Sequence, residues 1–105
     1  MWYGVSLLFE SVHTPEIDKE AVVWEMSVVL VKARDKSVAN DEGERIGKEQ
    51  EHEYTSATGD LVRWTFRQVE SVYEINADTV QSGTEVFSRF LRASDVRSLL
   101  TPFDD

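Results

Sequence analysis

The side chains that could act as catalytic bases or metal ligands are few and isolated in this sequence. Neither of the two histidines, His13 and His52, belongs to a Gly-x-Ser-x-Gly pattern or has another histidine at metal-ligand spacing. Glu49 and His52 have the Glu-x-x-His spacing of di-metal bundles, but such bundles need a second copy of the motif. The absence of cysteine excludes disulfides, thiolate metal sites and cysteine nucleophiles. We therefore predict no catalytic residues, no metal site and no cofactor.

Carboxylates are the most abundant remaining reactive groups. Five of them fall on predicted strands: Glu10, Glu25, Glu70, Glu74 and Glu85. Paired carboxylates could serve glycoside hydrolysis or bind a hard cation, but 20 acids in 105 residues make suggestive pairs unavoidable. Arg89 lies between Phe87 and Phe90, so it is the basic residue that we most expect to be partly buried. A buried arginine needs a carboxylate partner, and Glu74 or Glu10 would supply it in a structural ion pair.

Alternating apolar residues predict the strands that would position these groups. Residues 2–12 alternate as a strand with one well-buried face does. Residues 21–34 predict a second strand, with Trp24, Met26, Val28 and Leu30 on one face and Glu25, Ser27, Val29 and Val31 on the other. The short connection between the two predicts an antiparallel pair.

The third strand-like stretch, residues 61–75, changes parity along its length. Its early apolar positions are Val62, Trp64 and Phe66, whereas the later ones are Val69, Tyr73 and Ile75. A strand holds both sets on one side only with an extra residue, which predicts a β-bulge near Arg67–Gln68. A last strand is predicted over residues 84–91.

A helix is predicted between the two pairs of strands. Asp35 or Ser37 can cap its N-terminus. One sector about 100° wide gathers the uncharged positions Ala39, Gly43, Ile46, Gly47, Gln50 and Tyr54. Because Ala39, Gly43 and Gly47 in this sector are small, the backbone of the helix should approach the sheet closely.

This order predicts an α+β fold: a mostly antiparallel four-stranded sheet in ββαββ order, one helix on one face and a short C-terminal helix. Residues 1–105 would form a single domain, with a peripheral tail from about residue 94. A single helix covers only one face of such a sheet, while two strands carry apolar residues on both faces. We therefore expect a homodimer that covers the other face or an edge with a second copy.

The net charge of −9 argues against binding to nucleic acid or to an anionic membrane surface. Residues 36–60 hold 7 acids against 3 bases, so a basic protein partner would be expected on the helix side. The apolar runs are shorter than the roughly 20 residues of a membrane span, and no basic segment precedes the N-terminal one. We expect a soluble cytoplasmic protein.

Several ordered runs of aromatic and acidic residues resemble the small bacterial family known as "domain of unknown function 4288". These runs are Trp2–Ser11, Trp24-Glu25, Glu51–Tyr54, Trp64–Phe66, Val72–Ile75 and Gly83–Leu91. The resemblance implies a stand-alone cytoplasmic bacterial protein without assigned activity. It also directs attention to polar residues inside apolar runs as interaction or buried polar groups, namely Glu10, Glu25, Glu53, Glu74, Glu85 and Arg89.

Two functional interpretations remain open. The first is a non-catalytic, dimeric interaction module that neutralises a basic partner, in an immunity- or antitoxin-like role. The second is a small-ligand-binding protein or hydrolase with a pocket between helix and sheet, lined by Tyr54, Trp24 or Trp64 and one of the embedded acids.

Overall fold

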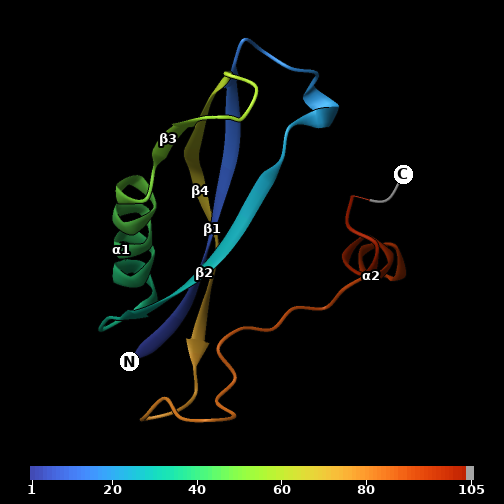
Figure 1. Cartoon of the computed structure of the whole chain (residues 1–105). Helices are drawn as coiled ribbons and strands as arrows, with labels where there is room; N and C mark the ends of the chain where they lie inside the picture. The colour runs from blue at the N-terminus through green and yellow to red at the C-terminus, as the bar shows by residue number, and fades with distance from the viewer. Residues whose placement is uncertain (104–105) are drawn as a thin grey trace.

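In the computed structural model, which describes residues 1–103, a four-stranded antiparallel sheet carries one helix on one face (Figure 1). The elements are β1 (Trp2–Thr14), a 3-10 turn (Lys19–Ala21), β2 (Trp24–Lys32), α1 (Lys36–Glu49), β3 (His52–Thr55), β4 (Leu61–Ile75) and α2 (Ala93–Leu100). The strands lie in the order β2-β1-β4-β3. The predicted α+β class and the ββαββ order are confirmed.

The core lies between α1 and one face of the sheet, here called the inner face. Its centre is the odd-numbered row of β1, and the buried members are Tyr3, Val5, Leu7 and Phe9. The helix backbone approaches this row closely, as the small residues predicted. A Cβ atom on Gly43 would lie 2.6 Å from Val5, and one on Gly47 would lie 2.3 Å from the ring of Phe66. Only glycine fits at these two positions.

The helix begins where its sequence predicts and ends earlier than its apolar sector suggests. Asp35 is the N-cap, and its side chain accepts a hydrogen bond of 2.9 Å from the backbone N–H of Val38. The helix ends at Glu49, and the chain enters β3 at His52. The expectation that Tyr54 continues the helical sector is wrong, because Tyr54 pairs with Val62 across the β3–β4 ladder.

The strand that completes the sheet is β3, whereas the prediction assigned this place to residues 84–91. Residues 84–91 form no strand; they belong to residues 76–92, here called the strap, which crosses the outer face of the sheet (Figure 1). A Cβ atom on Gly4 would lie 2.0 Å from the backbone oxygen of Val86, so strap and strand meet backbone to backbone. The side chains of Glu85, Phe87 and Arg89 contact β4, but the segment forms no ladder pairing.

Two bulges interrupt β4 where it pairs with β1. Register shifts fall between Leu8 and Phe9 and between Ser6 and Leu7, which leaves Arg67 and Glu70 as the extra residues. The bulge predicted near Arg67–Gln68 is confirmed, and the second was not foreseen. The two extra residues bring Val69 onto the inner face, and Tyr73 stays on the outer face.

Candidate functional site

The second bulge of β4 creates a polar cluster on the outer face, under the strap. Ser6 is completely buried, and its Oγ lies 2.6 Å from a carboxylate oxygen of Glu70 and 2.8 Å from the Oγ of Ser71. The guanidinium of Arg89 donates to the same Glu70 oxygen. One carboxylate thus joins the sheet to the strap. We call Ser6, Glu70, Ser71 and Arg89 the strap cluster.

Aromatic and acidic residues hold the strap beside this cluster. The rings of Tyr73 and Phe87 meet edge to face with centroids 6.1 Å apart, and the guanidinium of Arg89 lies 5.0 Å from the centroid of Phe87. The hydroxyl of Tyr73 donates to Glu85. Since Tyr73 belongs to β4 and the other three to the strap, these contacts fix the strap on the sheet.

The electrostatics of the strap follow from these hydrogen bonds. The Ser6 hydroxyl holds the pKa of Glu70 below its ordinary value, and Arg89 lowers it further. The Tyr73 hydroxyl likewise lowers the pKa of Glu85, with help from Ser88. Both carboxylates therefore prefer the ionised state in the folded protein, so they act as fixed acceptors and not as proton donors.

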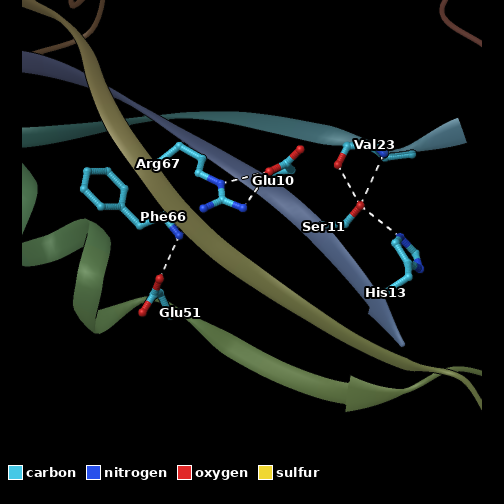
Figure 2. A network of polar contacts seen from close by, with 7 residues as sticks. All are labelled: Glu10, Ser11, His13, Val23, Glu51, Phe66 and Arg67. Atoms are coloured by element: carbon cyan, nitrogen blue, oxygen red, sulfur yellow. Dashed lines mark hydrogen bonds and ion pairs between the residues drawn. The ribbon is translucent and has the colours of Figure 1, made fainter. Parts of the chain in front are cut away.

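The first bulge produces a second ion pair on the outer face (Figure 2). Arg67 approaches Glu10 with an Nη2–Oε1 distance of 2.7 Å and donates a second bond of 2.9 Å through Nε. Next to it, the Ser11 hydroxyl donates to the backbone oxygen of Val23 at 2.8 Å, and the His13 ring lies 3.1 Å from the same hydroxyl. The hydrogen bond between Ser11 and Val23 extends the β1–β2 hairpin beyond its last ladder pair, Glu10 and Trp24.

A carboxylate also completes the other edge of the sheet. Glu51 accepts a hydrogen bond of 2.9 Å from the backbone N–H of Phe66, at the point where β3 has not yet begun to pair with β4 (Figure 2). Its second oxygen lies 3.5 Å from Arg63. Glu51 thus replaces a missing strand partner, which is a structural role.

The structure places the six polar residues singled out from the sequence at separate locations. Glu10 pairs with Arg67, Glu85 with Tyr73, and Arg89 with Glu70; the expectation that Glu74 or Glu10 would pair with Arg89 is wrong. Glu74 lies on the inner side of β4, where its carboxylate adds to burial in raising the pKa of Tyr3.

Glu25 and Glu53 are exposed and form no hydrogen bond or ion pair within residues 1–103. Sequence reasoning missed Arg67 and Glu70 as the partners that organise the outer face. The parity change in residues 61–75 was a signal for the bulge at Arg67, whereas no sequence signal pointed to the second bulge at Glu70.

The outer face of β2 carries a row of apolar side chains. Trp24, Met26, Val28 and Leu30 are between 40% and 50% exposed and lie on the opposite side from Val29 and Val31, as predicted. We call these four residues the β2 stripe. The strap touches the stripe at Met26, whose sulfur lies 3.9 Å from the Arg89 guanidinium. Because β2 is an edge strand, the row lies at the margin of the sheet.

The expected pocket between helix and sheet does not form as described. Trp24 faces outward, away from α1, while Gly47 brings the helix onto Phe66. A hollow of about 520 Å³ lies instead at the end of the sheet. Its lining includes Trp2, Lys32, Glu74 and Asp78.

A family model matches this chain over residues 2–88, from β1 into the strap as far as Ser88. The chain belongs to the family described as Domain of unknown function (DUF4288). The DUF4288 match thus includes the sheet, α1 and most of the strap, and it ends before Arg89 and α2. No curated protein and no solved structure matches the chain. Within the described residues, no helix is both long and apolar enough to cross a membrane.

Proposed function

We propose that this DUF4288 protein is a non-catalytic interaction module that self-associates through the outer side of its sheet. The observation that carries the proposal is the β2 stripe. Four large apolar side chains at i, i+2 spacing are each about half exposed on an edge strand. Contiguous exposed apolar surface of this kind marks a protein–protein contact in a globular domain.

Light scattering coupled to size exclusion tests the self-association. A dimer elutes at twice 12.0 kDa and dissociates on dilution. Leu30→Asp places a charge on the stripe without touching the inner core, so it should yield the monomer. Val80→Asp is the matched control, because Val80 has nearly the same exposure (43% against 45%) but lies in the strap far from β2 in sequence. A wild-type chain that stays at 12.0 kDa at every concentration would refute the proposal.

The second part of the proposal is that the acidic helix side binds a basic protein, as in immunity- or antitoxin-like neutralisation. Residues 36–60 carry 7 acids and 3 bases. On the solvent-exposed side of α1, Arg45 is already neutralised by Glu42 and Glu49. Asp41 of α1 and Glu53 of β3 are exposed carboxylates without a hydrogen bond or ion pair in the described residues.

Affinity capture at two salt concentrations tests this part. A basic partner should bind at low ionic strength and elute at high salt, because the contact is electrostatic. Reversing the charge of both Asp41 and Glu53 to lysine should abolish capture, whereas Glu16→Lys, in the connection between β1 and β2, should leave it intact. A partner that binds the reversed chain equally well would contradict the helix-side location.

The hollow at the end of the sheet supports a second candidate, the binding of a small aromatic ligand. Lys32 lies 5.6 Å from the centroid of the Trp2 ring, so one cation and one aromatic surface line the same space. Quenching of tryptophan fluorescence during a metabolite screen tests it, since Trp2 lies in the wall. A Trp2→Leu variant that retains the full response would show that the signal arises elsewhere.

A further inference from the structure

The C-terminal helix is an apolar element without a partner in its own chain. α2 packs against no other helix or strand of residues 1–103, and Figure 1 shows it apart from the sheet. Leu99 and Leu100 are 65% and 77% exposed, and Phe90, just before the helix, is fully exposed. The strap is fixed on the sheet as far as Arg89, so the chain leaves the surface at Phe90.

The helix nevertheless has its own start signal. The carboxylate of Asp95 accepts a hydrogen bond of 2.9 Å from the backbone N–H of Arg92, which closes the first turn. A helix of 8 residues is far below the roughly 12–15 residues at which isolated helices become even marginally stable in water. Its stability must come from packing an apolar side against another surface.

We propose that the occupant of the β2 stripe is α2 of a second copy of this chain, and that each chain of a two-fold dimer gives its helix to the other. The inference rests on the proposed self-association and names the segment that makes the contact. Two apolar surfaces of one chain stay exposed, the stripe and α2. In a two-fold dimer, α2 of each chain covers the stripe of the other chain. The two equivalent contacts then bury both stripes and both helices.

Charge complementarity supports this occupant. Residues 89–103 contain three arginines and one aspartate, whereas residues 1–88 contain 8 basic and 17 acidic residues. The connection that leads into Trp24 carries Glu16, Asp18 and Glu20, all exposed. The exposed Arg92 and Arg97 of a partner's helix would lie against this acidic end of the stripe. An uncharged or acidic helix would lack this complement.

The lengths are also compatible. The stripe extends over six residue steps of β2, about 20 Å at 3.3 Å per residue. α2 is about 12 Å long at 1.5 Å per residue. The apolar residues Phe90 and Phe103 lie before and after the helix, so the apolar segment as a whole exceeds the helix alone. The segment can therefore cover the row of four side chains.

Reciprocal variants of the full chain test the exchange. Leu99→Asp disables the helix, Leu30→Asp disables the stripe, and each variant alone should be monomeric. Mixed together, they should form a heterodimer weaker than the wild type, since the helix of the Leu30→Asp chain and the stripe of the Leu99→Asp chain remain intact. Val80→Asp serves as the control for an added charge. Because α2 contacts no helix or strand of its own chain, Leu99→Asp should keep the wild-type circular dichroism and thermal transition of the sheet domain.

The cysteine-free chain allows a direct test of which chain supplies the helix. Met26→Cys and Leu99→Cys chains, mixed and treated with a short bis-maleimide, should give a cross-linked product containing one copy of each. Replacing Leu99→Cys by Val80→Cys should abolish this product.

The outcomes separate the inference from the function on which it rests. A wild-type dimer that persists in Leu99→Asp, or a Met26→Cys/Leu99→Cys double variant that cross-links only within one chain, overturns the helix exchange and leaves self-association standing. A wild-type chain that is monomeric at all concentrations overturns both.

Discussion

Replacing Gly4 by alanine should detach the strap from the sheet. The new Cβ atom would lie 2.0 Å from the backbone oxygen of Val86, a distance that no pair of such atoms tolerates. Gly4 lies on β1 with a negative φ, so the strand itself accepts alanine. The inner core is on the other side of β1. The substitution therefore acts on the strap alone.

The magnitude follows from the contacts that the strap would lose. The Tyr73–Phe87 ring pair contributes about 0.5–1.5 kcal/mol. The partly exposed Arg89–Glu70 pair contributes about 0.2–1 kcal/mol. The contact of the Arg89 guanidinium with Phe87 contributes about 0.5–1 kcal/mol. Alanine returns about 0.5–1 kcal/mol through its lower conformational entropy in the unfolded chain. We expect the free energy of unfolding to fall by about 0.2–3 kcal/mol.

Two assays check this expectation. Urea denaturation followed by tryptophan fluorescence measures the stability at one fixed protein concentration, because dimerisation would otherwise shift the midpoint. Limited trypsin digestion measures detachment directly, since cleavage after Arg89 should accelerate once its guanidinium leaves Glu70. Thr14→Ala at the exposed end of β1 should change neither readout. A Gly4→Ala chain that is more stable than wild type and equally resistant at Arg89 would refute the backbone contact between β1 and the strap.

Three further perturbations follow from the geometry. Gly47→Ala should destabilise the fold by about 1–2 kcal/mol in urea, because overpacking against Phe66 outweighs the roughly 1 kcal/mol gain in helix propensity; a stabilised variant would contradict the close approach. Asp35→Ala should lower the free energy of unfolding by about 1 kcal/mol, because it removes the acceptor of the Val38 N–H. Asp35→Asn, which keeps an acceptor oxygen, should retain most of that stability. Glu70 has a lowered pKa when folded, so its stabilising effect is complete above the ordinary glutamate value and is lost as the pH falls through the lower folded value. Digestion of the strap by pepsin, a protease that is active in acid, should accelerate in that pH range in wild type, and Glu70→Gln should flatten the pH profile.

Much of the fold could be predicted because its local signals are unambiguous. Alternation over residues 2–12 and 21–34 gave both strands and assigned Val29 and Val31 to the face opposite Met26. The sector of small residues around Gly43 and Gly47 predicted close helix–sheet packing. Asp35 was one of two candidate caps. In each case the information lies within one element.

The wrong predictions concern segments whose sequence pattern is compatible with more than one structure. Tyr54 continues the helical sector of Gly43 and Gly47, so β3 could not be distinguished from a last helical turn. Residues 84–91 are rich in apolar and aromatic residues because the segment lies on a sheet, and such a composition does not show whether a ladder partner exists. The partner of Arg89 depends on the second bulge, and the parity change in residues 61–75 required only one. Tertiary contacts decided all three.

The two bulges of β4 have a consequence for how this sequence can change in length. Each extra residue reverses the side on which all following residues of the strand lie, and two reversals cancel. Deletion of one residue between Phe66 and Val72 would turn one end of the strand inside out, placing Tyr73 or Trp64 on the wrong side of the sheet. Deletion of one residue at each bulge would keep both ends in phase. Within DUF4288, natural length variation in this stretch should therefore occur in steps of two, and any chain that lacks both extra residues should also lack the ion pairs that Arg67 and Glu70 form here.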